Sequence, residues 1–333
     1  MSGGAGLGRM RAVRVNALSE DITAVDMEEI DLPAPGEGEV QIRIRACAVN
    51  FPDLLMVQGK YQFKPPLPFT PGMEAAGEIV AVGPGVTAFA PGDKVVAGLR
   101  TGGMAEGTNT PAASCRAMPA TMSYEEAAGY TTAYLTAYVS LARRGHLEAG
   151  ETLLVHGAAG GVGMAAVDLG KQMGATVIAT ASSQEKLDVL ADRGADHVIN
   201  VADGFKDRVK ELTGGRGADV IYDPVGGDVF DESVRCIAWG GRLLVIGFAS
   251  GRIPDISVNM PLIKGFSVVG VRAGEYGRRD PEKGAENIAA IDAMAAKGTI
   301  RPYVYASFPL DQAAEAMCQL RDRRVIGKVV VTP

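Results

Sequence analysis

The sequence predicts an α/β protein in which a β-rich part precedes a doubly wound parallel sheet. From residue 151 onward, short apolar segments alternate with segments of helical spacing, the pattern of a parallel sheet covered by helices on both faces. Residues 10–121 instead contain short β segments separated by glycine and proline. A chain of 333 residues is long enough for the two parts to be separate domains.

Composition and charge narrow the class of protein. The formal net charge of −6 argues against nucleic-acid binding, because that function normally needs clustered lysine and arginine. No apolar run is long enough to span a bilayer, and the N-terminus lacks the apolar core of a signal peptide. We therefore expect a soluble cytoplasmic protein without membrane or nucleic-acid partners. Residues 1–9 are rich in glycine and are expected to form a flexible lead.

The four cysteines and three histidines form no metal-binding pattern. The cysteines stand at positions 47, 115, 236 and 318, so no CxxC pair indicates a disulfide framework or a zinc ribbon. The histidines, at positions 146, 156 and 197, are equally scattered. His156 ends one predicted strand and His197 begins another, so packing is the favoured interpretation for both.

The β-rich part is expected to be built from both ends of the chain. Apolar and polar residues alternate from Val40 to Ile44, as in a half-buried strand. From about residue 300 the chain returns to short β segments and closes on the strand-like residues 328–331. We therefore expect a β-rich domain of residues 10–127, completed by 300–333, and a second domain of residues 128–299.

A change to helical pattern separates the two parts. Ser123 and Glu126 have the spacing of a capping box, which predicts that a helix begins there. A second helical segment follows and is expected to end near Gly145.

The most informative stretch runs from Glu151 to Ala181. An apolar strand leads into a glycine-rich turn, a helical segment follows, and a second apolar strand closes the unit. Glycines in such a turn let a pyrophosphate approach the backbone N–H groups and the positive end of the helix dipole. The GxGxxG pattern overlays on Ala158, Gly160 and Gly163, so its first glycine is replaced. We interpret the turn as a dinucleotide site; the alternative is a tight turn of any α/β protein. The residues assigned to this site are Ala159, Gly160, Gly161, Val162 and Gly163.

Several motifs resemble those of a known family. The most specific is VNFPDLLMVQGKYQFKPPLPFTPGMEAAGEIVAVG, from Val49 to Gly83, followed by GDKV, AAGGVG and the terminal GKVVV. In these motifs the chain resembles the medium-chain dehydrogenase/reductase superfamily, and specifically its zinc-independent, zeta-crystallin-like quinone oxidoreductase branch. The resemblance implies a GroES-like substrate domain around a Rossmann domain that binds NADP. It also implies a homodimer or homotetramer.

The resemblance also bears on whether a metal is bound. Zinc-dependent relatives hold their catalytic metal with a cysteine at the position of Asn50, a histidine at that of Met73, and a cysteine near that of Ala128. None of these three side chains can replace a thiolate or an imidazole at a tetrahedral site. The cysteine cluster of a structural zinc lobe is missing too, because residues 98–115 contain a single cysteine. We therefore predict an enzyme without a metal.

The end of the second strand predicts which dinucleotide is bound. An NAD site usually has Asp or Glu here, which accepts a hydrogen bond from the ribose 2′-hydroxyl. This chain has Ala181, followed by Ser182, Ser183 and Lys186, whose hydroxyls and ammonium suit a 2′-phosphate. Together with the resemblance, this pattern predicts NADPH. The alternative for Lys186 is an ordinary solvated residue, and Val201 replaces a tyrosine that many relatives pack over the phosphate.

Further cofactor contacts are expected where other strands end, because ligands bind at the carboxyl edge of a parallel sheet. One predicted strand ends at Val225 and Gly226, and another at Gly247. The resemblance implies that these loops contact the ribose and the carboxamide. It also implies that two further residues close over the cofactor, although each could be an ordinary surface polar residue instead. The residues assigned on these grounds are Val225, Gly247, Phe248, Ala249, Asn259 and Lys328.

Hydride transfer leaves negative charge on the acceptor, which hydrogen-bond donors must stabilise when no metal does so. Tyr61 aligns with the tyrosine that donates a proton in related enoyl thioester reductases. Asn50 can donate an amide hydrogen bond, Asp53 is expected to fix the local turn, and Arg272 is a positional candidate for the cleft. The alternative for Tyr61 is a packing role, because quinone reduction does not demand a dedicated acid.

The predicted function is NADPH-dependent reduction of quinones or of activated carbon–carbon double bonds, since both acceptors take hydride at an electron-poor carbon. A second possibility is an enoyl thioester reductase, for which Lys60 and Lys64 supply positive charge. A third is a non-catalytic protein that binds NADPH, as in relatives that serve as lens proteins or membrane-associated adaptors. Asn50, Tyr61 and the AAGGVG turn favour catalysis.

Overall fold

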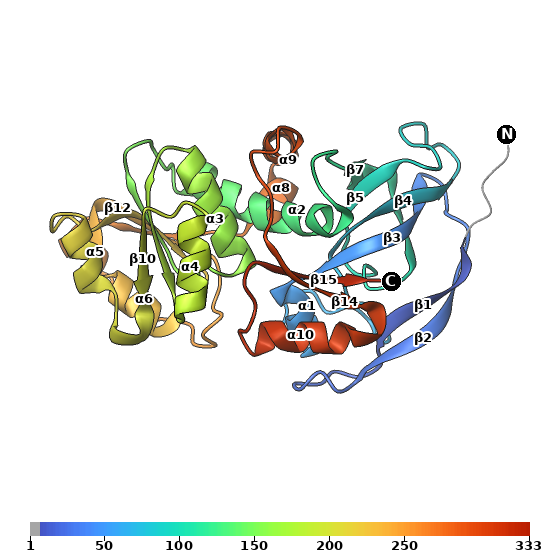
Figure 1. Ribbon diagram of the computed structural model, residues 1–333, viewed down its shortest axis with the longest axis horizontal. Helices are drawn as coiled ribbons and strands as arrows, with labels where there is room; N and C mark the ends of the chain where they lie inside the picture. Colours follow the sequence, from blue (N-terminus) through green and yellow to red (C-terminus); the bar gives the residue numbers. More distant parts are fainter. Residues whose placement is uncertain (1–6) are drawn as a thin grey trace. The chain divides into compact units, whose positions relative to one another are not determined.

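The computed structural model describes residues 7–333, which form two compact units. One unit contains the described residues up to Thr131 together with Ala295–Pro333, and the other contains Thr132–Met294. The chain passes between them within helix α2 (Tyr124–Tyr138) and again within helix α9 (Pro281–Ala296). Figure 1 shows the elements of both units in the colours of the sequence.

The expected flexible lead is only partly within the described chain. Residues 1–6 lie outside it. Gly8 and Arg9 already belong to strand β1 (Gly8–Val15), where they pair with Leu32 and Asp31. The prediction of a flexible lead was therefore wrong for these two residues, because their backbone groups are paired in a two-stranded antiparallel sheet.

The first unit is built on a seven-stranded sheet with the order β14-β15-β3-β4-β5-β7, in which β6 also pairs with β3. Strands β1 and β2 form a separate pair. Strand β15 pairs antiparallel with β3 and parallel with β14, so late residues form an interior strand and an edge strand of a sheet begun by early ones. The remaining elements of this unit are β2 (Val25–Leu32), β3 (Glu39–Val49), α1 (Phe51–Val57), β4 (Glu74–Val82), β5 (Lys94–Gly98), β6 (Gly107–Pro111), β7 (Cys115–Ala117), β14 (Val304–Pro309), α10 (Ala313–Arg321) and β15 (Lys328–Thr332), with short 3-10 turns at Ala112–Ser114 and Leu310–Gln312.

The apolar face of β3 lies at the core of the first unit. Val40, Ile42 and Ile44 are almost completely buried in one apolar cluster, as their alternation predicts. Gln41 is buried as well, because its amide donates hydrogen bonds to the carbonyl of Pro33 and the side chain of Asn109.

Helix α2 begins where the capping box predicts. The backbone N–H of Ser123 donates to a carboxylate oxygen of Glu126 at 2.9 Å, and the N–H of Glu126 donates back to the Ser123 hydroxyl at 3.3 Å. The two expected helical segments are one run, because α2 continues directly into a π-helical turn, Val139–Arg144. No proline interrupts this run, and it stops before Gly145, as expected.

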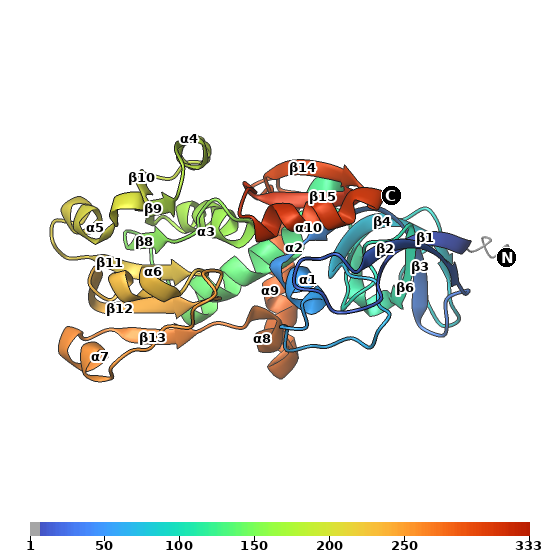
Figure 2. The ribbon, with the colours of Figure 1, turned by 90° about the horizontal axis from the view of Figure 1, so that it is seen from below.

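The second unit is a six-stranded parallel sheet with the order β10-β9-β8-β11-β12-β13. Figure 2 shows these strands one after another in this order. The elements are β8 (Thr152–Val155), α3 (Gly161–Gln172), β9 (Thr176–Ala181), α4 (Gln184–Asp192), β10 (His197–Asn200), a 3-10 turn (Val201–Asp203), α5 (Lys206–Leu212), β11 (Ala218–Asp223), α6 (Gly227–Ser233), β12 (Ile237–Val245), α7 (Asn259–Lys264), β13 (Ser267–Gly270) and α8 (Ala273–Arg279).

The parallel sheet brings the carboxyl ends of all its strands to one edge. The glycine-rich turn follows β8, Ser182 follows β9, Val225 follows β11, and Gly247 follows β12. This arrangement positions most of the predicted cofactor residues on one side of the second unit. Within residues 7–333, no helix combines the length and the hydropathy that a bilayer crossing requires.

Candidate functional site

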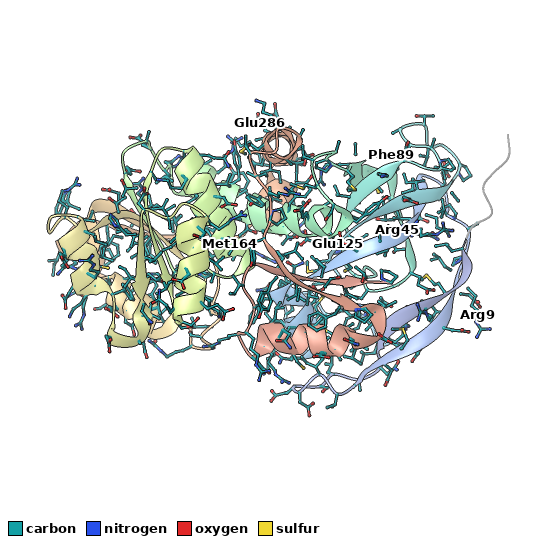
Figure 3. The ribbon with its side chains drawn as sticks, viewed as in Figure 1. Arg9, Arg45, Phe89, Glu125, Met164 and Glu286 are labelled. Atoms are coloured by element: carbon teal, nitrogen blue, oxygen red, sulfur yellow. The ribbon has the colours of Figure 1, made fainter. Side chains whose placement is uncertain are left out.

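Two backbone hydrogen bonds attach the start of the glycine-rich turn to the neighbouring strands of the sheet. The N–H of His156 donates to the carbonyl of Tyr222 at 3.0 Å, and the N–H of Ala158 donates to that of Thr180 at the same distance. These bonds tie the turn to β11 and to β9. Helix α3 then begins at Gly161, with Gly160 as its N-cap residue. Met164 in the first turns of this helix is labelled in Figure 3 and is buried.

Two glycines of the turn have different physical roles. A Cβ on Gly163 would lie 2.4 Å from the carbonyl oxygen of Gly157 and 2.8 Å from the Cα of Ala158, so the helix packs directly on the turn. A Cβ on Gly160 would meet only the Gly157 oxygen, at an ordinary 3.4 Å. Packing therefore requires glycine at 163 but not at 160. The open space beside Gly160 fits the close approach of a pyrophosphate to backbone N–H groups.

One further loop meets this turn, and a second loop is bonded to the first. The side chain of Val225 lies 3.2 Å from the position that a Cβ on Gly157 would take. The N–H of Ala249 donates to the carbonyl of Pro224 at 3.0 Å, and the N–H of Ser250 donates to that of Val225 at 2.9 Å. The structure thus gathers the turn residues 159–163, Val225 and the segment Gly247–Ala249 at one edge of the sheet.

Asp223 holds the first of these loops and was missed by the sequence reasoning. It is buried at the end of β11, and its Oδ1 accepts the N–H groups of Val225 and Gly226 at 2.8 and 2.9 Å. Its Oδ2 is buried without a hydrogen-bond partner among the described residues, and burial raises the pKa of this carboxyl. An Asp followed by Pro-Val-Gly-Gly at a strand end is the signal that could have revealed this turn.

His156 is a buried packing residue beneath the turn, as predicted. Its Nε2 lies 2.8 Å from the Ser233 hydroxyl, which donates its own hydrogen to the carbonyl of Val229. Nε2 must therefore be the donor, and Nδ1 accepts from the Thr180 hydroxyl at 3.1 Å. Burial lowers the pKa of this imidazole to about 3, so the ring is neutral and links β8, β9 and α6.

The residues predicted for a 2′-phosphate follow β9. Ser182 is exposed, and Ser183 is the N-cap residue of α4, where its hydroxyl oxygen accepts the N–H of Lys186 at 3.4 Å. The hydroxyl hydrogen of Ser183 is not used by this bond. Lys186 is half-buried in the first turn of α4. Ser182, Ser183, the N-terminus of α4 and Lys186 therefore follow β9 closely, and the nearest carboxylate after the strand is that of Glu185 in the first turn of α4.

Asn259 is not brought to this edge. It begins α7, a helix of six residues whose end leads into the amino end of β13. Figure 2 shows α7 beside the end of β13 that is opposite its arrowhead. Its side chain is exposed. The physical reason is that a crossover between parallel strands must return to the amino end of the next strand.

In the first unit, Asn50 belongs to a buried polar cluster with Glu74 and Lys328. The Asn50 amide nitrogen donates to Glu74 Oε1 at 3.0 Å, and its Oδ1 accepts from Lys328 Nζ at 2.7 Å. Lys328 Nζ also lies 3.1 Å from Glu74 Oε1. All three residues are less than 8% exposed. Gly129 on α2 makes room for the Lys328 stem, since a Cβ there would lie 3.3 Å from Cε.

Asp53 fixes the backbone around Asn50, as expected. Its Oδ2 accepts the N–H of Asn50 and its Oδ1 accepts the N–H of Gly72, both at 2.9 Å. Asp53 is completely buried, and burial raises the pKa of its carboxyl to about 7. Gly72 has a φ of +108° and its Cβ would lie 2.7 Å from Cys47 Sγ, so only glycine fits there.

Tyr61 follows the same short helix that Asn50 begins. Its N–H donates to the carbonyl of Leu55, and its ring packs partly buried against the core of the first unit. Its hydroxyl makes no hydrogen bond with residues 7–333. Met73 also packs against this core, and Ala128 is buried. Across the described chain, no three His, Cys, Asp or Glu side chains are arranged to hold a metal ion.

The first unit, built on a sheet from both ends of the chain, and the second unit, with its parallel dinucleotide-type sheet, have the architecture of a class of two-domain oxidoreductases. Family models agree with each half: residues 36–148 match the alcohol dehydrogenase GroES-like domain, and residues 161–291 match the zinc-binding dehydrogenase model. The chain belongs to the medium-chain dehydrogenase/reductase superfamily, in its quinone oxidoreductase branch.

Individual relatives support this assignment along the whole chain. A quinone oxidoreductase-like protein 2 homolog of Nematostella vectensis is 40% identical, over 96% of this chain and 88% of the relative. The structure of the Escherichia coli quinone oxidoreductase complexed with NADPH has a TM-score of 0.89 and 30% identity, covering 97% of this chain and all of the other. A mycobacterial protein complexed with NADPH has the same TM-score and coverage, with 33% identity.

Proposed function

We propose that this protein transfers hydride from NADPH to a quinone or to an activated carbon–carbon double bond, as in an enone or enal. The observation that carries the proposal is the convergence of the glycine-rich turn, the Val225 loop and the Gly247–Ala249 loop at the carboxyl edge of one parallel sheet. Two similar structures are described as complexes with NADPH. NADPH would supply the hydride, and this chain's residues would hold and orient it.

The residues proposed to bind the cofactor fall into groups according to the part of NADPH that they would contact. Backbone N–H groups of Ala159–Gly163 face a pyrophosphate, while Ser182, Ser183 and Lys186 take the 2′-phosphate that distinguishes NADPH from NADH. The loops around Val225 and Gly247–Ala249 would meet the ribose and carboxamide. Lys328 and Asn259 fit such a role less well, because Lys328 is bonded to Asn50 and Asn259 begins α7.

Asn50 is proposed to stabilise negative charge on the acceptor. Its amide nitrogen uses one hydrogen for Glu74, and the second N–H has no partner among residues 7–333. Because Oδ1 accepts from Lys328, the amide cannot flip without losing both bonds. Tyr61 is proposed as the proton donor, because its hydroxyl makes no hydrogen bond with the described residues.

We propose that catalysis needs no metal. The argument rests on donor chemistry: Asn50 already uses both amide atoms within its cluster, Met73 packs against the core, and Ala128 has no donor atom. A stoichiometric zinc that is removed together with activity would contradict this proposal.

The decisive experiment is NADPH oxidation with matched panels of quinones, enones and enoyl thioesters, alongside direct measurement of NADPH binding. Turnover of quinones or enones supports the proposal. Turnover confined to enoyl thioesters would favour the second candidate, although Lys60, one of its two proposed cations, is paired with Glu20 at 2.8 Å. Tight NADPH binding without turnover of any acceptor would favour a non-catalytic nucleotide-binding protein.

We also propose that the protein is cytoplasmic and forms a homodimer or a homotetramer. Strand β13 is at the edge of its sheet, and large apolar side chains of the neighbouring segments are exposed. These are Trp239, Val258, Leu262, Ile263 and Val268. Sedimentation of the wild type and of Leu262→Asp tests this, because a monomeric wild type would contradict it.

A further inference from the structure

A cationic cavity lies at the end of β13 in the second unit. Its volume is about 380 Å³, and the residues that give it charge are Arg144, Arg272, Glu275, Arg279, Asp280 and Lys283. They come from the π-helical turn, from both ends of α8 and from the start of α9. Four cations therefore face two carboxylates around a space large enough for the anionic group of a small ligand.

Both carboxylates are already engaged by basic side chains. Glu275 accepts from Arg278 at 3.1 Å and from Arg279 at 2.8 Å, which lowers the pKa of its carboxyl. Asp280 pairs with Lys283 at 3.1 Å. The side chain of Arg272 makes no hydrogen bond or ion pair with residues 7–333, and the side chain of Arg144 uses only Nε, which donates to the carbonyl of Gly270 at 3.2 Å. The cavity thus keeps cationic donors in excess.

The walls of the cavity are tied together. Arg143, next to Arg144, donates to Glu286 at 2.6 Å and to the buried Asn287 at 2.8 Å, which fixes the π-helical turn against α9. Glu286 is labelled on α9 in Figure 3. The N–H of Gly284 donates to the carbonyl of Asp280, so α8 and α9 are joined at the cavity. The cationic groups are therefore presented by elements that bond to one another.

The order of the strands places this cavity beside the proposed cofactor residues. Those residues follow β9, β8, β11 and β12, which are consecutive in the sheet, and β13 is the next strand. The residues expected at the nicotinamide end follow β11 and β12. Gly270 ends β13 at the same carboxyl edge, and Arg272 comes two residues later.

We propose that this cavity binds an anionic group, a carboxylate or a phosphate, of the electron acceptor, with Arg272 as its principal donor. The proposal rests on the function proposed above and narrows its substrate class: the preferred acceptor carries negative charge some distance from its electron-poor double bond or quinone ring. Arginine suits this task because its planar fork of donors can bind a carboxylate or phosphate through two hydrogen bonds.

Calorimetric binding to the full chain in the presence of NADP⁺ tests the proposal without requiring turnover. One pair of probes is benzylideneacetone and its para-carboxylate, and the other is the crotonyl thioester of N-acetylcysteamine and crotonyl-CoA. The wild type should bind the charged member of at least one pair about tenfold or more tightly than the neutral member. The pair that shows the preference identifies whether the anion is a carboxylate or a nucleotide phosphate.

Arg272→Ala should abolish this preference while leaving affinity for the neutral probes unchanged. Arg278→Ala is the matched control, because Arg278 also pairs with Glu275 but does not line the cavity. Equal affinity for charged and neutral probes, or a preference that survives Arg272→Ala, would overturn the proposal. Failure to reduce neutral enones and quinones would instead contradict the proposed function, and the binding comparison would still decide on the cavity.

Discussion

Lys328 Nζ donates a hydrogen bond of 2.7 Å to Oδ1 of Asn50, which lies 278 residues earlier in the chain. This bond sets the amide orientation of Asn50, because the oxygen must face Lys328 and the nitrogen must face Glu74. A side chain that the resemblance assigns to the cofactor is therefore also a positioning residue for a proposed catalytic amide.

Removing one partner of the buried Glu74–Lys328 ion pair should destabilise the first unit strongly. Glu74→Gln leaves the Lys328 ammonium buried without its partner, which costs about 3–5 kcal/mol of unfolding free energy. Lys328→Met likewise removes the cation that pairs with the buried Glu74 carboxylate. The double variant should cost less than the sum of the two single changes, because neither charge is left alone. Urea unfolding of all four proteins measures this, and additive effects would show that the two charges do not interact.

The glycines at 160 and 163 should respond differently to the same small change. Gly163→Ala places a methyl group against the backbone of Gly157 and Ala158, and should cost about 1–3 kcal/mol of stability. Gly160→Ala meets no tight contact and should leave stability unchanged while weakening NADPH binding by about tenfold, since its methyl enters the pyrophosphate space. Thermal unfolding and fluorescence titration with NADPH test the pair. Unchanged affinity in Gly160→Ala would argue against the assigned pyrophosphate position.

Lys186→Ala should reduce the preference for NADPH. Loss of one charge-assisted contact predicts about a 10- to 100-fold rise in the Kd for NADPH, with little change for NADH. Lys210→Ala, on the exposed face of α5, serves as the control. If wild-type protein binds NADH as tightly as NADPH, or if Lys186→Ala binds NADPH normally, Lys186 does not hold the 2′-phosphate.

Tyr61→Phe tests the proton donor directly. The change removes only the hydroxyl, which makes no hydrogen bond in the described chain, so folding should be unaffected. Turnover of an enone should fall by about 10²–10⁴-fold if the phenol donates the proton. Quinone turnover should fall less, because a quinone can take its proton from water. Tyr305→Phe, at a partly exposed tyrosine of β14, is the control, and full enone activity in Tyr61→Phe would leave Tyr61 a packing role.

His156 should make the second unit less stable in acid. Its pKa is lowered from 6.5 to about 3 in the folded state, so between these values the unfolded chain binds a proton that the folded chain does not. Stability therefore falls as the pH drops through this range, by about 2 kcal/mol between pH 7 and pH 5 from this group. His156→Gln should show a smaller loss over the same interval. Identical pH dependence of the urea midpoints in both proteins would mean that His156 does not contribute.

Local patterns predicted the parts of the fold that depend on near neighbours. The turn between β8 and α3 and the capping box at Ser123 are set by residues a few positions apart, so their spacing was visible in the sequence. Helices α7 and α8 were not predicted, because six and seven residues are too few to establish a periodic apolar face. Strand β2 was missed because its alternating residues are acidic and half-exposed.

The candidate site was predictable where it follows strand ends and unpredictable where it depends on distant partners. The cofactor loops could be located because parallel strands share a carboxyl edge. The cluster of Asn50, Glu74 and Lys328 could not, since pairing of β15 with β3 is a tertiary event between remote segments. The role of Asp223 was open to prediction from its turn sequence, whereas its unpartnered oxygen depends on burial by the surrounding fold.

The interior position of β15, between β14 and β3, also sets an order of events during synthesis. A ribosome delivers β3 and Asn50 long before it delivers Lys328, so the nascent chain holds the carboxylate of Glu74 without its cation for most of translation. The parallel sheet of Thr132–Met294 uses only residues made in between and is able to fold first. The amide proposed to face the acceptor therefore gains its final orientation last, after the nucleotide-type sheet is already complete.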